Sequence, residues 1–579
     1  MAKETMYVWM AAAALIAAPT ATLAATKSDP LYRYQWHLYN HGQKVFADSL
    51  PVAGYDLDIG SLHDQQVRGS GINVAVVDDG LEIRHPDLLA NVAIGGSKNF
   101  VDGSNDPTPT DPHSEHGTSV AGIIAAVGWN GIGGRGVAPE AKLRGFNFLS
   151  QDADGIETSQ DQNIRYAWGN GVEAKDADVF NNSWGTTTSQ YGAFTRAEAK
   201  SWERLMSSTR AGKGGIYLKA AGNNFSSFLS FGFNFCADDS VALNVGCSSA
   251  NVDNLNNLTT TIVVAAVNAK GVRSSYSSAG SSVWVSGLGG EFGFQKKFYP
   301  DTSNIGSWAK PTFYDPAIVT TDLTGCAAGS NADRTDGERD NALDTSQSTV
   351  DASCNYWAGM NGTSAATPTV AGVASLILGV NPRLTGRDVK YILAATARQI
   401  DPLQAKAVYQ GAVQDPGWIV NAAGHPYSNW YGFGLVDATA ATRLAKSFQT
   451  LPAQIDTGWL ASKDPATPIE GIGSDASKLT VHVGKHEKVE SVQVSFDTTH
   501  VTPRNLRAIL TSPSGTRSYI LPAFTTLDAT PGGFSVDLTS SNAFLDEQAN
   551  GTWTLQVLDM VDPNTATKLS AFNLRVVGH

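Results

Sequence analysis

Short apolar segments alternate with helical patterns through the first half of the chain, and this alternation most limits the fold. The first segment, 71–78, is a run of small and β-branched residues that ends in Asp78-Asp79-Gly80. Four similar segments follow at 141–149, 177–184, 215–220 and 261–267. Helical patterns lie between them, such as 118–127 and 195–209. Strands and helices that alternate at this spacing predict a parallel sheet with helices on both faces.

Polar residues follow the predicted strands where such folds bind ligands. Asp78, Ser183 and Asn223 each stand at or just after the end of a strand. In open α/β sheets, ligands bind beyond the carboxyl ends of the strands. We therefore expect a site at this edge of the sheet.

The stretch 361–368, Asn-Gly-Thr-Ser-Ala-Ala-Thr-Pro, ends a polar loop and opens a run of small and apolar residues. This pattern predicts a buried helix with Ser364 in its first turn. Unpaired N–H groups and the helix dipole there favour developing negative charge. Taken alone, Gly-Thr-Ser is better explained by a simple capping role, so the catalytic interpretation depends on the rest of the chain.

A third motif, 116–122, places His116 at the start of a helix of small residues. With Asp78 and Ser364, it completes the order Asp, His, Ser, which is one of the known orders of a catalytic triad. A lone histidine is usually structural, so the argument depends on the three motifs occurring together.

These three blocks resemble the active-site blocks of the subtilisin-like serine proteases. Further stretches resemble the kexin and furin branch of that group, and the resemblance runs from about Asp29 to the C-terminus; these stretches are the doubled Asp78-Asp79, 221–223, 384–389 and 431–438. The resemblance implies a subtilisin-like α/β fold, with a parallel sheet flanked by helices.

The resemblance also implies a role for each residue. Ser364 is the expected nucleophile, His116 the general base and acid, and Asp78 the residue that orients the imidazole. Asn223 matches the oxyanion-hole asparagine, although Gly-Asn-Asn is also ordinary turn chemistry. The implied activity is a serine endopeptidase that acts through an acyl-enzyme.

Substrate preference is where the sequence departs from kexin-like relatives. The expected substrate-binding residues are Asp79, Ser183, Trp184, Gly185 and Asp253. The branch selects a basic residue with several carboxylates, but this chain has Thr188 and Ser278 at two of those positions. Asp79 and Asp253 still favour cleavage after basic or paired basic residues.

A calcium site is implied by the same resemblance. The matching ligands are the side chains of Asp29, Asp87 and Asn130 and the carbonyl groups of Val127, Ile132 and Gly134. Oxygen ligands from a turn and two carboxylates suit Ca²⁺. The alternative is a turn with a solvated carboxylate.

The N-terminal residues 1–24 predict a secretory signal peptide, with Lys3 before an apolar stretch and a small-x-small pattern at 22–24. A short buried helix is the alternative. No later stretch reads as a membrane span, and a net charge of −13 without a long basic run argues against nucleic acid as a partner. We expect a secreted protein, exported through the periplasm if the source is a Gram-negative-type bacterium.

Four cysteines fit an oxidising compartment, and neither of their spacings resembles a zinc site. Three pairings exist, of which Cys236 with Cys247 and Cys326 with Cys354 are favoured as the local ones; buried free thiols are the alternative.

The character of the chain changes near residue 451. Alternating stretches then predict an antiparallel β-sandwich, which resembles the jelly-roll-like P-domain that follows kexin-type catalytic domains. We expect three parts: 1–24 signal peptide, 25–450 catalytic domain and 451–579 β-sandwich.

The expected partners are protein or peptide substrates, and the protein is expected to be a monomer. The resemblance begins soon after the signal peptide, so in place of the prosegment that relatives carry we expect a separate folding chaperone. The alternative is a chain that folds unaided. A rival hypothesis is an inert subtilase scaffold that binds or adheres through the β-sandwich. Intact Asp78, His116, Ser364 and Asn223 argue against it.

Overall fold

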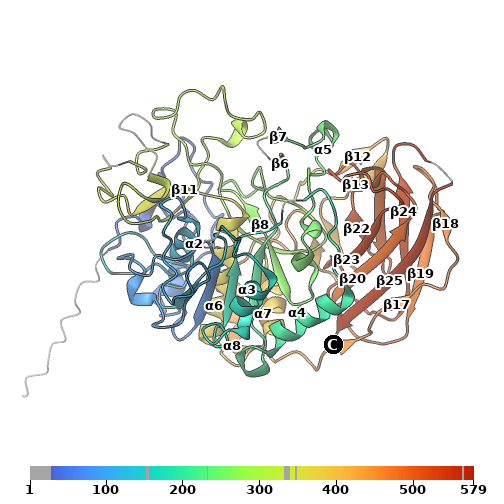
Figure 1. Cartoon of the computed structure of the whole chain (residues 1–579), viewed down its shortest axis with the longest axis horizontal. Helices are drawn as coiled ribbons and strands as arrows, with labels where there is room; N and C mark the ends of the chain where they lie inside the picture. Colours follow the sequence, from blue (N-terminus) through green and yellow to red (C-terminus); the bar gives the residue numbers. More distant parts are fainter. Residues whose placement is uncertain are drawn as a thin grey trace, which may run out of the picture.

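The computed structural model describes residues 28–579 except 152–154, 187, 231–232, 332–339, 346–347 and 564–565. The expected signal peptide, 1–24, lies outside the described residues. Figure 1 shows an α/β part and, beside it, an all-β part that ends at the C-terminus.

A seven-stranded sheet forms the centre of the first part, in the order β2-β3-β1-β4-β5-β8-β9. All neighbouring strands pair in parallel. The strands are β1 (Asn73–Asp78), β2 (Lys98–Asn99), β3 (Lys142–Asn147), β4 (Val179–Asn182), β5 (Ile216–Ala220), β8 (Thr261–Val267) and β9 (Val283–Leu288). The predicted parallel sheet is therefore confirmed.

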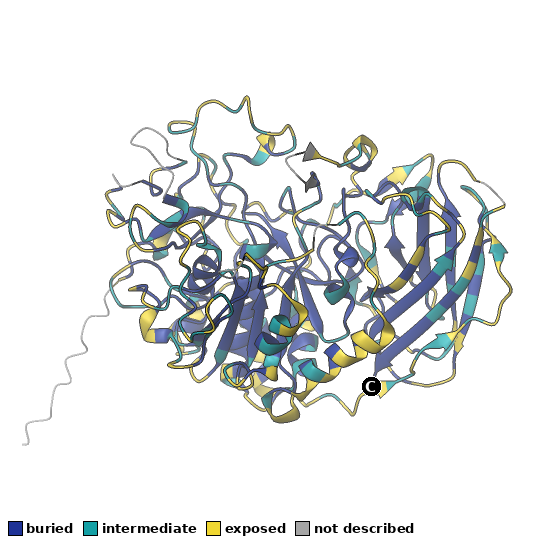
Figure 2. Ribbon diagram, in the orientation of Figure 1, coloured by how far each residue is buried: buried dark blue, intermediate teal, exposed yellow. Residues whose placement is uncertain are grey.

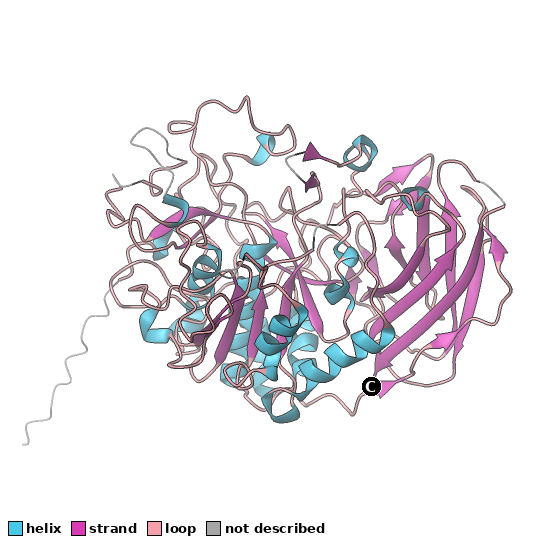
Figure 3. Ribbon diagram, in the orientation of Figure 1, coloured by secondary structure: helices cyan, strands magenta, loops and turns pink. Residues whose placement is uncertain are grey.

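Helices cover both faces of this sheet, as Figure 3 shows. The described α-helices of this part are α1 (Gly60–Asp64), α2 (His116–Ala125), α3 (Asp161–Arg165), α4 (Arg196–Ser208), α5 (Asp238–Ala242), α6 (Thr363–Val380), α7 (Gly386–Thr396) and α8 (Ala438–Ser447). Of these, α5 lies away from the sheet, near the all-β part. On one face α6 packs against β4, β5, β8 and β9, and also against α2 and α8. On the other face an aromatic cluster includes Trp168, Phe180, Trp202 and Tyr217.

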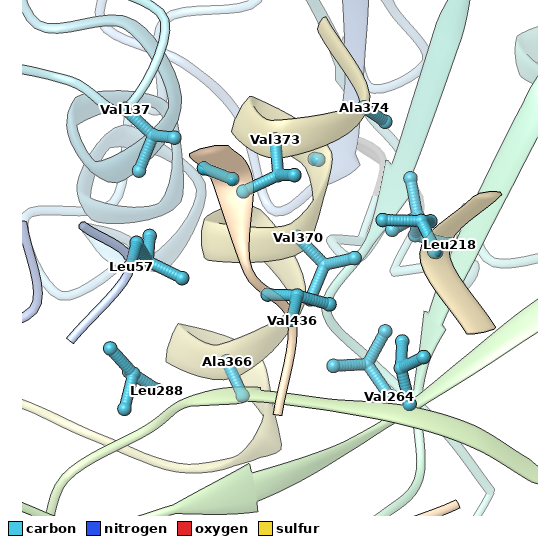
Figure 4. Packing of buried hydrophobic residues seen from close by; sticks show 14 of the residues in the cluster. Leu57, Val137, Leu218, Val264, Leu288, Ala366, Val370, Val373, Ala374 and Val436 are labelled. Carbon is cyan, nitrogen blue, oxygen red and sulfur yellow. The ribbon is translucent and has the colours of Figure 1, made fainter. Parts of the chain in front are cut away.

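The helix α6 is the centre of the main core. Val370, Val373 and Ala374 of this helix are fully buried, and Figure 4 shows them among Leu218, Val264 and other apolar side chains. The helix is long and apolar enough to cross a membrane, with a mean hydropathy of 1.4, but 83% of it is buried inside the protein. The expectation that no later stretch is long and apolar enough to span a membrane is thus corrected. The helix is apolar because other elements surround it, as its buried colour in Figure 2 shows.

The second part is an antiparallel sandwich, as the alternating pattern predicted. One sheet has the order β16-β25-β20-β23, with β17 and β18 also paired to β25, and the other has the order β19-β24-β21-β22. The strands are β16 (Ile455–Asp456), β17 (Leu460–Ala461), β18 (Thr467–Pro468), β19 (Lys478–Val483), β20 (Val489–Thr498), β21 (Leu506–Thr511), β22 (Arg517–Leu521), β23 (Ser535–Ser541), β24 (Gly551–Asp559) and β25 (Lys568–Gly578).

Small hairpins complete the described fold. They pair β6 (Leu229–Ser230) with β7 (Phe233–Asn234), β10 (Ile318–Thr321) with β11 (Tyr356–Met360), β12 (Ala407–Tyr409) with β13 (Ala412–Asp415), and β14 (Ile419–Val420) with β15 (Pro426–Tyr427). Both favoured disulfides are present, Cys236–Cys247 and Cys326–Cys354.

The two parts meet across a buried polar junction. Arg575 on β25 pairs with Glu203 on α4, with 2.8 Å between Nη1 and Oε2, and both residues are more than 90% buried. The side chain of Asn251 donates hydrogen bonds to the Thr539 hydroxyl and the Ser540 carbonyl of the sandwich. Val252 belongs to the hydrophobic core of the sandwich, so the loop around it is held by both parts.

Candidate active site

Asp78 and His116 meet where a strand ends and a helix begins. β1 ends at Asp78 and α2 begins at His116, and the imidazole Nδ1 lies 2.7 Å from Asp78 Oδ1. A carboxylate accepts hydrogen bonds, so Nδ1 carries the proton and Nε2 is left as the basic nitrogen. Asp78 is fully buried, whereas the His116 side chain is 36% exposed.

Gly117 explains how the helix can start so close to the strand. A Cβ atom at this position would lie 2.0 Å from the Gly80 carbonyl oxygen and 2.9 Å from Asp78 Cβ. Because backbone atoms cannot yield to such a contact, only glycine permits the approach. The glycine after His116 is therefore needed for the Asp78–His116 hydrogen bond.

Asp79 binds the start of α2. Its carboxylate accepts hydrogen bonds from the backbone N–H groups of Gly117, at 2.7 Å, and His116, at 3.2 Å. This carboxylate was expected to face the substrate. In the structure both of its oxygens accept hydrogen bonds from the first turn of α2. Burial, with the nearby Asp78 charge, raises the pKa of Asp79 to about 7.

The electrostatics around His116 favour its protonated form. Burial lowers its pKa, but the Asp78 charge and hydrogen bond outweigh that effect, and Asp79 adds to them. The pKa of His116 is raised to about 9 as a result. An imidazolium formed during a reaction is therefore stabilised at this position.

Ser364 lies in the first turn of α6, as predicted. The preceding Gly362 has a φ of 90°, a conformation that favours glycine. The Ser364 hydroxyl donates a hydrogen bond to the Ser183 carbonyl at 2.9 Å rather than to His116. The hydroxyl must therefore leave the Ser183 carbonyl before it can donate its proton to another group.

Asn223 is oriented by Thr363. Its Oδ1 accepts hydrogen bonds from the Thr363 backbone N–H and hydroxyl, both at 2.9 Å. A backbone N–H only donates, so this contact assigns the side-chain oxygen, and the amide nitrogen is left free to donate. Asn223 itself is exposed.

A pocket of about 130 Å³ lies beside Ser364. It is lined by Ser183, Trp184, Gly185, Thr186, Ala220, Ala221, Gly222, Asn223, Asn224, Ser248, Ser249, Ala250, Val252, Asp253, Asn256, Ser278, Thr363 and Ser364. The expected residues Ser183, Trp184, Gly185 and Asp253 are thus brought together with the serine. Asp79 is not among the lining residues.

The comparisons with known proteins agree with this geometry. The model of the subtilase family matches residues 69–434, and that of the proprotein convertase P-domain matches residues 489–576. The chain belongs to the subtilase family.

Curated subtilases resemble this chain over nearly all its length. The extracellular serine protease of Aeromonas sobria is 38% identical across 95% of this chain and 91% of that protein. Protease KEX1 of Kluyveromyces lactis is 29% identical across 95% of this chain and 60% of its own length. The crystal structure of the Aeromonas sobria protease in complex with the chaperone ORF2 matches with a TM-score of 0.85, 36% identity and coverage of 96% and 95% of the two chains. This subtilase is therefore a serine endopeptidase with kexin-like relatives.

The residues expected to bind calcium lie together in this subtilase. Asp29 Oδ2 accepts hydrogen bonds from Trp129 N and Arg135 Nε, and Asp87 Oδ1 accepts one from Asn130 Nδ2. Asn130 thus presents its nitrogen to Asp87, whereas its oxygen was expected at the metal.

The Asp87 side chain supports a cation nearby. Among the residues that the structure describes, none is a hydrogen-bond partner of the buried Asp87 Oδ2. Burial, with the Asp29 charge, raises the pKa of this carboxyl to about 8. Oxygen donors around such an atom fit Ca²⁺. Arg135 pairs with Asp29 at 2.5 Å and supplies a cation that the sequence did not suggest. Among the described residues no group of three or more His, Cys, Asp or Glu could hold a metal.

Two further residues were missed from the sequence. The Tyr276 hydroxyl accepts a hydrogen bond from Gly362 N at 2.8 Å and so holds the loop before Ser364. Lys219 on β5 is fully buried and pairs with Asp253. Tyr276 has no distinguishing pattern, but a lysine inside an apolar strand is a signal that could have been noticed.

Proposed function

We propose that this subtilase is an exported endopeptidase whose catalytic residues are Asp78, His116 and Ser364. The observation that carries the proposal is the 2.7 Å contact between Asp78 and His116 at the start of α2, a helix that packs against α6, whose first turn carries Ser364. The family assignment supports it. The inert, adhesive scaffold is not supported.

The proposed reaction uses these residues in order. Ser364 Oγ attacks the scissile carbonyl while His116 Nε2 takes its proton, and Asp78 stabilises the imidazolium that forms. His116 then donates this proton to the leaving amine, and the acyl-enzyme is hydrolysed by water in the same way. The Asn223 amide, together with the Ser364 N–H, stabilises the oxyanion of each tetrahedral intermediate.

Active-site labelling tests this proposal directly. A fluorophosphonate probe should label the wild-type protein on Ser364 and leave the Ser364→Ala variant unlabelled. Labelling should also be lost in His116→Ala, because the nucleophile then has no base. Equal labelling of Ser364→Ala would refute the assignment of the nucleophile.

A bound Ca²⁺ ion is part of the proposal. Asp87, with Asp29, Asn130 and the carbonyl groups of Val127, Ile132 and Gly134, would hold it. Bound there, the ion would join the N-terminal segment to the loop after α2 and would stabilise the fold.

Export and a folding partner complete the proposal. The two disulfides fit an oxidising compartment, and a relative is named as extracellular. A structural neighbour is a complex of a protease with a chaperone, which supports a separate chaperone for this chain.

Cleavage after basic residues is one candidate for the specificity. The kexin-like relatives and the position of Asp253 in the pocket support it. The ion pair between Asp253 and Lys219 favours another candidate, which is argued next.

A further inference from the structure

The carboxylate of the pocket is neutralised by a buried lysine. Lys219 Nζ lies 2.6 Å from Asp253 Oδ2, and the two side chains are 0% and 8% exposed. The ammonium also donates a hydrogen bond to the Trp184 carbonyl at 2.9 Å and lies 4.5 Å from the centre of the Trp184 ring. Lys219 is thus fixed to the wall of the pocket at two points.

The Asp253 carboxylate also accepts hydrogen bonds from two backbone N–H groups. Its Oδ2 accepts a hydrogen bond from Thr186 N at 3.0 Å, and its Oδ1 accepts one from Leu255 N at 3.0 Å. Each carboxylate oxygen therefore already has a donor. A substrate cation would have to compete with donors that the fold supplies.

The ion pair lies against the surface that a substrate side chain meets. A Cβ atom built on Gly185 would be 3.3 Å from Asp253 Oδ2 and 3.5 Å from Lys219 Nζ. Gly185 lines the pocket, so a guest side chain is exposed to both charges at similar range. Their fields largely cancel there.

The other lining groups are uncharged. Ser248, Ser249 and Ser278 contribute hydroxyl groups, and Asp253 is the one charged residue among the lining residues. Asn256 also lines the pocket, and its buried Oδ1 has no hydrogen-bond partner within the described part of the chain. An acceptor without a donor favours a guest that carries an N–H or O–H group.

We infer that Lys219 is a specificity determinant, which makes this pocket select uncharged polar side chains before the scissile bond instead of cations. The inference rests on the proposed function, in which Ser364 attacks the bond beside this pocket. An arginine or lysine side chain would lose its hydration on entry and would meet a pair of no net charge. A neutral side chain of the same shape loses less hydration free energy on entry and can still donate a hydrogen bond to Asn256 Oδ1.

Matched peptides test the inference on the wild-type enzyme. Two pairs differ only in charge or in the polar end: arginine against citrulline, and lysine against norleucine, each placed before the scissile bond. We expect kcat/KM for citrulline to equal or exceed that for arginine, and the lysine peptide to have no advantage over norleucine. A preference for arginine over citrulline of about 100-fold or more would overturn the inference.

A substitution then identifies the residue responsible. Lys219→Met keeps the apolar stem of the side chain, removes the ammonium and so leaves the Asp253 charge unpaired. The ratio of kcat/KM for arginine to that for citrulline should then rise by about 10-fold or more. Lys390→Met is the matched control, because Lys390 is another buried lysine that donates to a carbonyl, that of Thr259, and lies over a tryptophan, Trp284. Lys390 does not line this pocket, so the ratio of kcat/KM for arginine to that for citrulline in Lys390→Met should stay at the wild-type value.

Each outcome decides the matter. If Lys219→Met does not fold, the wild-type ratio alone decides. An unchanged ratio in folded Lys219→Met would refute the role of Lys219. If no peptide is cleaved, or if Ser364→Ala cleaves them equally well, the proposed function fails rather than this inference.

Discussion

The Asn223 side-chain oxygen is held by both the N–H and the hydroxyl of Thr363, the residue before the nucleophile. These two contacts, both at 2.9 Å, link the oxyanion donor directly to the loop that carries Ser364. The amide nitrogen therefore keeps its orientation relative to the serine before any substrate binds. Such preorganised donors need no reorganisation during the reaction.

Replacing Asn223 by alanine should lower kcat by about 10²–10³-fold and leave KM nearly unchanged, because the amide acts on the intermediate. Thr363→Val keeps the N–H contact and loses the hydroxyl contact, so its kcat should fall less. Steady-state kinetics on one peptide measures both variants. A higher KM with an unchanged kcat in Asn223→Ala would contradict the role of Asn223 in stabilising the oxyanion.

Ser364→Ala and His116→Ala should each lower kcat by about 10⁵–10⁶-fold, and the double variant should be hardly worse than either, since the triad acts as a unit. Circular dichroism should show that each variant remains folded. Turnover within ten-fold of the wild type in either purified variant would contradict the triad.

The pH profile should follow the shifted pKa of His116. The imidazole must be neutral to act as a base, so kcat/KM should rise with pH, reach half of its maximum near 9, the value to which Asp78 raises the pKa, and level off above it. Asp79→Asn removes a second charge that raises the pKa, so the rising limb should move to lower pH.

The same shift affects stability with the opposite sign. Protonated His116 stabilises the folded state fully below its unfolded pKa of 6.5, and this contribution is lost as pH rises to about 9. Thermal melts between these pH values should therefore show a falling midpoint that Asp79→Asn makes shallower. A flat profile in both measurements would contradict the shifted pKa.

Removal of calcium should destabilise the protein. An ion present at 100 times its Kd stabilises the folded state by about 2.7 kcal/mol, so chelation with EDTA should lower the melting temperature by several degrees. Asp87→Asn is nearly isosteric and should abolish the difference between melts with and without EDTA. An unchanged wild-type midpoint would exclude the ion.

Folding should depend on a separate chaperone. Refolding of the purified chain alone should recover little peptidase activity, and co-expression with a chaperone of the type bound to the Aeromonas protease should restore it. Titration with the fluorophosphonate probe gives the active fraction directly. Full recovery without any added protein would contradict this dependence.

The parallel sheet and the sandwich were predicted because each has a local pattern. Of the three possible cysteine pairings, the two local ones that were favoured are present. Three short motifs, together with the family resemblance, predicted the grouping of Asp78, His116 and Ser364. Strands β2 and β9 of the sheet were not predicted, and the limits of the other strands moved by a few residues. Edges of elements depend on hydrogen bonds to distant neighbours, which a local pattern does not contain.

The sequence did not predict the partners of the charged groups. Asp79 and Asp253 stay predicted substrate-binding residues, and Asp253 lines the pocket, but they also bind N–H groups of α2 and the ammonium of Lys219. Arg135, likewise, was not expected beside Asp29. In each case the partner is far along the chain or is hidden in an apolar run, so only the folded arrangement shows which carboxylate remains free.

Val252 and Asn251 attach the loop that carries Asp253 of the pocket to the sandwich. Val252 sits in the sandwich core, next to Asp253 of the pocket, and Asn251 is tied to Thr539 and Ser540. Contacts with the sandwich, which contributes no proposed catalytic group, restrict the conformations of this loop. Large-to-small substitutions in the core of the sandwich should therefore reduce selectivity between peptides while kcat for the best peptide persists. Selectivity and catalysis would then be separable properties of one chain.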